Sequence, residues 1–230
     1  MNNIEQLTAE NAEYKAKIEE LERQISELTV GKKGKKKERK VSNAESACRV
    51  ITEDEYHEII ETLQTGFCGM RPNPRIAAAL TVETNTGLRI SDVLKLRLCD
   101  IVKDGSRYRL NITETKTGKP RRFTVNSRVY DYLVRYCYEN GIKQDEVIFN
   151  LTERAVHYQL RKTVEWLGLE GVVSTHSFRK FFATRIYNNS NYNLALVQEL
   201  LQHSSPAITR RYIGIGTQEV EEALENGTIL

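Results

Sequence analysis

Apolar side chains recur at alternating steps of three and four residues through the first 30 positions of the chain. This pattern is the a and d seam of a coiled coil over four heptads, and isoleucine at a with leucine at d favours a parallel dimer. Asn11 is the single polar a position, which is expected to fix the register at some cost in stability. We therefore predict that residues 1–30 form a coiled-coil oligomerisation helix; an amphipathic helix folded back on the rest of the chain is the alternative. The seam consists of Ile4, Leu7, Asn11, Tyr14, Ile18, Leu21, Ile25 and Leu28.

A run of lysines follows this predicted helix. The stretch GKKGKKKERK, residues 31–40, carries seven basic side chains against one glutamate. Because like charges repel and glycines loosen the backbone, we predict that residues 31–47 form a basic flexible linker. Such a segment serves as a solubilising tether, as an arm that binds phosphates or as a nuclear localisation signal. Its candidate DNA-binding residues are Lys32, Lys33, Lys35, Lys36, Lys37, Arg39 and Lys40.

The remaining residues, 48–230, have the composition of one globular domain. The chain has 230 residues, of which 40% are hydrophobic, and this is enough for one ordinary core. It contains no long apolar run, and its first residues, MNNIEQLTAE, lack the features of a signal peptide. Its four cysteines fit no Cys-x-x-Cys metal pattern. We therefore expect an intracellular protein with reduced thiols, no membrane partner and no metal site.

The fold class predicted for this domain is α+β, mainly helical, with a small antiparallel β-sheet. The sheet is expected within residues 98–125, where LCDIV, YRLNIT and RRFTV are short β-like runs and ETKTGKP joins the last two. Helices are expected after the capping box of ITEDEYHEIIETL and in several further segments. These are residues 74–86, 91–97, 128–140, 153–167, 177–188, 194–202, 206–212 and 218–226.

Four stretches of this domain carry polar groups that are unusual for a plain hydrophobic core. Two of them lie in the first half of the domain. In TGLRISDVLKL, Arg89 stands at a helix start that we expect Ser91 to cap. A guanidinium there needs an anion nearby, which is either a ligand or the side chain of Asp92. In TETKTGKPRR, Lys116 and Lys119 stand at a hairpin tip, where they face solvent or enter a DNA groove. The basic residues that follow them, also candidates for DNA binding, are Arg121 and Arg122.

The other two polar stretches lie near the C-terminus. In THSFRKFFATRIY, His176 and Arg179 are three apart and therefore share one helical face. In QHSSPAITRRY, His203 precedes a helix that Ser205 caps and that carries Tyr212. By itself, Tyr212 would be interpreted as a half-buried core residue.

Together, these stretches supply the groups that metal-free cleavage of a phosphodiester requires. Two guanidiniums can neutralise the charge of a pentavalent transition state, which in other enzymes is the task of metal ions. Tyr212 would be the nucleophile, and because the pKa of a free tyrosine is about 10, it needs help to lose its proton.

The motifs resemble those of the tyrosine recombinase, or phage integrase, family over about residues 50–220. GLRISD, KTGK, HSFRK and QHSSPAITRRY match its arginine, hairpin-lysine, His-x-x-Arg and final histidine–tyrosine blocks in the family's order. The resemblance implies an integrase-type catalytic domain that acts on double-stranded DNA without cofactor or metal and forms a 3′-phosphotyrosine. It also implies a cytoplasmic location with the DNA, at the nucleoid. The implied catalytic residues are Arg89, Lys116, His176, Arg179, His203 and Tyr212, with Asp92 in the family's acidic supporting position.

The resemblance also implies a division of labour among these residues. Arg89, Arg179 and His203 would hold the scissile phosphate, and Tyr212 would attack it. Lys116, with Lys119 as the alternative, would protonate the 5′-hydroxyl leaving group. His176 would be a phosphate ligand or a proton carrier.

The sequence departs from this family before residue 50. The family usually has a helical core-binding domain there, whereas this chain has the predicted coiled coil and basic linker. We expect a coiled-coil dimer, a tetramer on paired DNA sites, and linker lysines that replace part of the lost DNA affinity. A non-catalytic DNA-binding protein and a type IB topoisomerase are the alternative functions.

If residues 1–30 determine assembly, replacing the polar a residue should change both stability and oligomer choice. We expect Asn11→Ile to raise the melting temperature, because a buried amide is lost, and to broaden the distribution of oligomers. Analytical ultracentrifugation at micromolar concentration measures the latter. If the full chain and a truncated chain beginning at residue 41 are both monomeric, the coiled-coil prediction is wrong.

Overall fold

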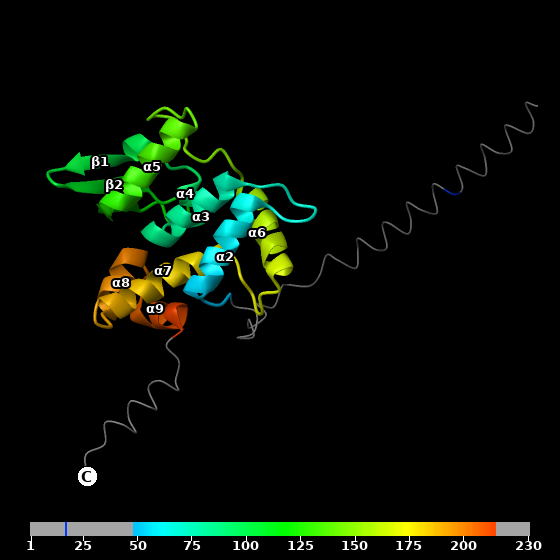
Figure 1. Cartoon of the computed structure of the whole chain (residues 1–230). Helices are drawn as coiled ribbons and strands as arrows, with labels where there is room; N and C mark the ends of the chain where they lie inside the picture. The colour runs from blue at the N-terminus through cyan, green and yellow to red at the C-terminus, as the bar shows by residue number, and fades with distance from the viewer. Residues whose placement is uncertain (1–16, 18–47, 215–230) are drawn as a thin grey trace, which may run out of the picture. The chain divides into compact units, whose positions relative to one another are not determined.

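The computed structural model describes residues 48–214 and also Lys17, which is helical and exposed. The rest of the predicted coiled coil, the linker of residues 31–47 and the helix predicted over residues 218–226 lie outside the described residues. The described domain is mainly helical, with one small sheet (Figure 1). Its elements are α2 (Glu53–Thr65), α3 (Pro74–Thr86), α4 (Ile90–Val93), the 3-10 helix η2 (Leu98–Asp100), β1 (Ile101–Asp104), β2 (Arg107–Thr113), β3 (Pro120–Val125), α5 (Ser127–Glu139), α6 (Glu153–Leu167), α7 (Thr175–Asn189), α8 (Leu194–Leu201) and α9 (Pro206–Ile213).

Side-chain caps begin most of these helices, as the sequence predicts. Thr52 and Glu55 form a capping box, in which the Glu55 N–H donates to Thr52 Oγ1 at 3.1 Å and the Thr52 N–H donates to Glu55 Oε2 at 2.8 Å. Thr152, Asn193 and Ser205 each accept a backbone N–H at the start of α6, α8 and α9. The predicted bounds of α3 and α6 are confirmed at both ends, and those of α5, α7, α8 and α9 within two residues.

The prediction of a helix over residues 91–97 is wrong in its cap and its length, although the helix starts within one residue of the predicted position. α4 ends at Val93, and its N-cap position is Arg89, so Ser91 does not cap it. Beyond α4, the Leu96 carbonyl accepts a hydrogen bond from the Ile148 N–H at 2.9 Å, and Arg97 forms a β-bridge with Val147. The chain is extended here because these long-range bonds take the place of helical ones.

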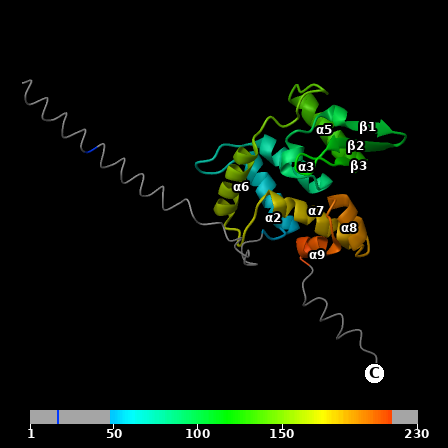
Figure 2. The ribbon, with the colours of Figure 1, turned by 180° about the vertical axis from the view of Figure 1, so that it is seen from behind.

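The predicted antiparallel sheet is confirmed, with strand order β1-β2-β3. Leu110 of β2 lies opposite Phe123 of β3, and both strands present alternate residues to the interior. α5 packs beside β2, where the rings of Tyr108 and Tyr130 stack with their centroids 3.9 Å apart. Figures 1 and 2, seen from opposite sides, both show the sheet and α5 grouped together.

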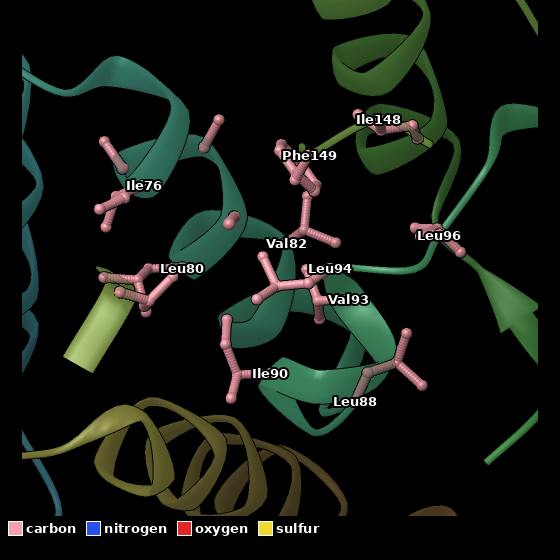
Figure 3. Packing of buried hydrophobic residues seen from close by; sticks show 14 of the residues in the cluster. Ile76, Leu80, Val82, Leu88, Ile90, Val93, Leu94, Leu96, Ile148 and Phe149 are labelled. Carbon is pink, nitrogen blue, oxygen red and sulfur yellow. The ribbon is translucent and has the colours of Figure 1, made fainter. Parts of the chain in front are cut away.

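The main core is built around α3, which is buried on most of its surface. Its alanines at positions 77–79 allow α2 and α7 to pack closely against it. Side chains of α3 and of residues 88–96 converge with Ile148 and Phe149 (Figure 3). A second, smaller cluster joins α7, α8 and α9, which lie together in Figures 1 and 2. Its buried members are Phe182, Ala183, Val197, Leu201 and Ile213.

Gly87 ends α3 at the point where α3 and α7 meet. Its φ is +62°, in the left-handed region that favours glycine, and a Cβ atom at this position would overlap the ring of Phe182. Gly168 ends α6 with nearly the same φ, +64°, but a Cβ atom there would have no neighbour within 4 Å. Comparing an alanine substitution at each glycine therefore separates the cost of the left-handed backbone conformation from the cost of crowding Phe182.

We expect Gly168→Ala to lower the free energy of unfolding by about 1–2 kcal/mol, the cost of the left-handed conformation. Gly87→Ala should lower it by about 1–3 kcal/mol more, because Phe182 must also move. Urea denaturation of both variants measures the difference. Equal losses would mean that the contact with Phe182 relaxes without cost.

Candidate active site

A buried carboxylate, Glu114, lies between two arginines just after β2. Its Oε2 is 2.5 Å from Arg89 Nη1, and its Oε1 is 3.1 Å from Arg121 Nη1. Thr117 Oγ1 also donates to Oε2, at 2.8 Å. The side chains of Glu114 and Arg121 are 0% and 2% exposed, whereas that of Arg89 is 17% exposed. The carboxylate is therefore fully paired inside the protein, and Arg89 keeps access to solvent.

Arg121, which we predicted to bind DNA, instead lies in the interior. In β3 it shares the inward-facing positions with Phe123 and Val125. Its guanidinium lies 5.0 Å from the centroid of the Phe123 ring, and its Nη2 donates to the Leu200 carbonyl. The prediction is wrong because strand alternation turns this side chain inward, whereas the neighbouring Arg122 is exposed.

The two buried partners influence each other's ionisation. Burial raises the pKa of Glu114, but hydrogen bonds from Thr117 and Arg89 and the charges of Arg89 and Arg121 together bring the pKa below its ordinary value. Burial, followed by the charge of Arg179, lowers the pKa of Arg121 to about 10. The carboxylate and the guanidinium therefore both remain charged at neutral pH.

Lys116 lies at the tip of the turn that connects β2 and β3. The Glu114 N–H donates to the Lys119 carbonyl, and the Gly118 N–H donates to the Glu114 carbonyl, both at 2.9 Å. Gly118 has a φ of +65°, which this tight turn requires. The side chains of Lys116 and Lys119 are exposed, as expected for a hairpin tip.

Asp92 braces this turn and does not pair with Arg89. Its Oδ1 accepts the Thr115 N–H at 2.8 Å, and Lys95 Nζ donates to Thr115 Oγ1 at 3.1 Å. The alternative interpretation of an Arg89–Asp92 pair is wrong, because Arg89 pairs with Glu114. α4 is thus joined to the hairpin through the backbone beside Lys116.

Arg179 lies on α7 and is 2% exposed. Its Nη1 donates to the Gly87 carbonyl, and its Nη2 donates to the Leu201 carbonyl at 3.0 Å. This guanidinium therefore ties together the ends of α3 and α8. Burial lowers its pKa, the negative charge that Tyr212 can carry raises it, and the charge of Arg89 lowers it further.

His203 and Tyr212 pack edge to face, with their ring centroids 4.9 Å apart. His203 Nδ1 is 3.1 Å from Thr209 Oγ1, and the Tyr212 hydroxyl has no hydrogen-bond partner among the described residues. Burial raises the pKa of Tyr212 to about 12, against the charge of Arg179, which lowers it. Burial and the charges of Arg179 and Arg89 lower the pKa of His203 to about 4, so its imidazole is neutral at pH 7.

His176 lies near the start of α7 and lines a cleft of about 690 Å³ together with Arg89 and Lys116. Partial removal from water, followed by the charges of Arg179, Lys116 and Arg89, lowers its pKa. On the floor of the cleft, His157 Nε2 is 3.3 Å from Thr175 Oγ1. The six residues predicted to be catalytic thus come from the N-cap position of α4, the hairpin, α7, the loop after α8, and α9, and the charge of Arg179 acts on His176, His203 and Tyr212.

Two buried carboxyl groups that act on the arginines of this site were missed in the sequence. Glu114 continues the alternating inward positions of Leu110 and Ile112 in β2. The alternation therefore predicts that this carboxylate points inward, where it needs a buried cation as its partner. Glu83 is a fully buried residue of α3, where burial raises its pKa well above the ordinary value and the charge of Arg179 opposes this shift only in part. No sequence pattern indicated Glu83, because a helix buried on most of its surface has no polar face to break.

Among residues 48–214, no three His, Cys, Asp or Glu side chains gather as a metal site would require. Over the same residues, no helix is both long and apolar enough to cross a membrane.

The described domain has the fold of a tyrosine recombinase catalytic domain. The catalytic domain of bacteriophage HP1 integrase superposes with a TM-score of 0.56 at 20% identity, covering 78% of this chain and 95% of that one. Lambda integrase in a dimer bound to a COC′ core site superposes with a TM-score of 0.58 at 20% identity, over 76% of this chain and 50% of that one. Similarity at this identity establishes the fold alone.

The sequence itself establishes the family. The model of the phage integrase family matches residues 49–219, and the chain belongs to this family. The probable integrase/recombinase YoeC of Bacillus subtilis (strain 168) is 33% identical over 138 residues, which are 57% of this chain and 72% of YoeC. The tyrosine recombinase XerC of Caldanaerobacter subterraneus subsp. tengcongensis is 25% identical over 190 residues, 78% of this chain and 51% of XerC. The chain thus spans about half the length of this XerC relative.

Replacing Glu114 should produce a loss of stability that depends on pH. Because its pKa is lowered on folding, the carboxylate stabilises the protein above the ordinary pKa of glutamate, and this contribution disappears as the pH falls through the lower, folded-state value. We expect Glu114→Gln to lower the free energy of unfolding by about 3–5 kcal/mol at pH 7, because the buried Arg121 and the partly exposed Arg89 lose their counter-charge. The difference from wild type should shrink below pH 4.

Urea denaturation at pH 7 and at pH 3.5 measures both effects. Glu165→Gln is the matched control, because Glu165 pairs with Lys162 at the surface and its replacement should leave stability nearly unchanged. A loss for Glu114→Gln that is the same at both pH values would contradict the assignment of the effect to ionisation.

Proposed function

We propose that this chain is a site-specific DNA recombinase that cleaves and rejoins DNA strands through a covalent 3′-phosphotyrosine. The observation that carries the proposal is the setting of Tyr212. Its phenol packs against a neutral imidazole, its hydroxyl is unpaired among the described residues, and the charge of Arg179 acts on it. A binding module has no need of a nucleophile so arranged. Membership in the phage integrase family supports the same reaction.

In the proposed reaction, the Tyr212 oxygen attacks the scissile phosphorus. A bond forms between this oxygen and phosphorus while the bond from phosphorus to the 5′ oxygen breaks. The phenol gives up its proton to solvent water, and Lys116 gives a proton to the departing oxygen. Attack by a 5′-hydroxyl on the phosphotyrosine reverses the exchange. Because one phosphodiester replaces another, the cycle needs no ATP.

Arg89, Arg179 and His203 are proposed to stabilise the phosphate in the transition state. Arg89 uses one side of its guanidinium on Glu114 and is partly exposed on the other, and Arg179 contributes a buried positive charge. This role for His203 requires the tautomer in which Nδ1 accepts from the Thr209 hydroxyl, so that Nε2 carries the proton and donates it to a phosphate oxygen. His176, at the cleft with Arg89 and Lys116, is proposed as a phosphate ligand or proton carrier. These charges would act in place of a metal ion.

Double-stranded DNA is the proposed substrate. Two of the solved structures with this fold are described as XerH bound to a palindromic difH substrate and lambda integrase bound to a core site. On this chain, the exposed Lys119 and Arg122 of the hairpin region are candidates for phosphate contacts, and Asp92 is proposed as a support for the hairpin. We further propose that the protein resides with the DNA of the nucleoid.

The N-terminal segments have proposed roles that rest on sequence. The heptads of residues 1–30 favour a homodimer, and two such dimers on paired DNA sites would form a tetramer. The lysines of residues 31–47 would add DNA affinity that does not depend on base sequence, through phosphate contacts.

Tyr212→Phe should abolish the covalent species, because it removes the nucleophilic oxygen and little volume. The wild-type protein should capture nicked duplexes from a random library, because the cut fragment escapes and religation then lacks its partner. The adduct should survive denaturant and form in the presence of chelator. Denaturing gel electrophoresis of labelled duplex measures it, and DNA binding by the variant should persist.

Tyr192→Phe is the matched control, because this tyrosine is 65% exposed and lies outside the site. It should leave adduct formation unchanged. An adduct that still forms with Tyr212→Phe would overturn the assignment of the nucleophile, and relaxation of DNA by the monomeric protein without strand exchange would indicate a topoisomerase.

A further inference from the structure

Lys180 follows Arg179 on α7 and has no part in the proposed cleavage reaction. Its Nζ donates to the Cys48 carbonyl at 2.6 Å and lies 5.6 Å from the centroid of the Tyr212 ring. The side chain is only partly exposed to solvent. One ammonium group therefore contacts both the first residues of the domain and the ring of the proposed nucleophile.

We infer that Lys180 is a positioning residue for the nucleophile: its ammonium, anchored by the Cys48 carbonyl, holds the ring of Tyr212 in place and favours the phenolate over the phenol. The inference rests on the proposed function of Tyr212 and adds a residue to that site.

The physical basis is the interaction of a cation with an aromatic ring. A partly desolvated ammonium near a ring is attracted to it even when the phenol is neutral. When the phenol loses its proton, the negative charge spreads over the ring, and the attraction to Lys180 increases. The ammonium therefore stabilises the reactive form of Tyr212 more than its resting form.

The carbonyl of Cys48 accounts for the fixed position of this ammonium. A lysine side chain has many rotamers, and holding one of them costs conformational entropy. The 2.6 Å hydrogen bond to Cys48, 132 residues away in the sequence, offsets that cost. The ammonium thus stays near the Tyr212 ring because a backbone oxygen from the start of the domain holds it there.

Other charged or titratable groups face Tyr212 from the elements packed around it. From α7, Arg179 lowers the pKa of the phenol, whereas Glu83 of α3 and Cys48 raise it. His203 contributes no charge at neutral pH, because its own pKa is about 4. Burial is the largest influence and raises the pKa of Tyr212 to about 12. Lys180 is therefore a second cation, after Arg179, that opposes the effect of burial on the ionisation of Tyr212.

The first test measures the pH dependence of covalent adduct formation. The substrate is the pool of nicked duplexes that the wild-type protein captures from a random library, used in single-turnover reactions between pH 6 and pH 10. We expect Lys180→Met to form the adduct about five- to thirtyfold more slowly at pH 7, with the rate profile displaced to higher pH. Lys180→Arg, which keeps the cation, should recover most of the rate. Lys162→Met is the matched control, because Lys162 pairs with Glu165 on the surface of α6 and should show the wild-type profile.

The second test observes the phenol without DNA. In the full chain labelled with 3-fluorotyrosine, the ¹⁹F resonance that is absent from Tyr212→Phe belongs to residue 212, and its titration gives the midpoint of ionisation. We expect a higher midpoint in Lys180→Met than in wild type. Coincident midpoints, or a rate loss that Lys180→Arg does not recover, would overturn the inference. If the wild type forms no adduct but the midpoints differ, the proposed function fails and the effect of Lys180 on the phenol stands.

Discussion

The carboxylate of Glu114 is the interaction on which the site depends. It neutralises Arg89 and Arg121 in the interior and also accepts a hydrogen bond from Thr117 in the hairpin turn. Without it, two guanidiniums would lie close together with little access to water, which costs several kcal/mol. Because Arg121 also donates to the Leu200 carbonyl, this cluster joins the helix junction, the sheet and the end of α8. Arg89 thereby has a fixed position, with one side left for a ligand.

The remaining groups are arranged around an excess of positive charge. Burial, followed by the charge of Arg179, lowers the pKa values of His176 and His203, and Arg89 lowers both further, so His203 is a neutral hydrogen-bonding group at pH 7. Among the described residues, no anion pairs with the exposed side of the Arg89 guanidinium. A phosphodiester bound there would supply that negative charge. Tyr212 stays protonated in the free protein, because burial raises its pKa to about 12. A nucleophile that is unreactive without its substrate is consistent with an enzyme that must not cut DNA at random.

Several features of the domain were predictable from local sequence. Caps such as Thr52 and Ser205 satisfy backbone N–H groups within three residues, and the hairpin follows from a short turn that contains Gly118. The order of the motifs indicated six candidate catalytic residues and also the family, and of these two predictions the family match confirms the family. The predictions of the caps, the hairpin and the family succeeded because they depend on neighbours in the chain or on the order of motifs, and neither requires knowledge of how distant elements pack.

The sequence by itself therefore determined most of the helices, the sheet and the family. Tertiary structure decided which of the charged groups pair. Arg89 lies beside Glu114 and not Asp92, Arg121 points inward, and Lys180 reaches Cys48 across the domain. The early end of α4 has the same origin, since Leu96 bonds with Ile148 in a distant segment. Each of these outcomes depends on contacts between residues far apart in sequence, where burial makes an unpaired charge or backbone group too costly to leave unsatisfied.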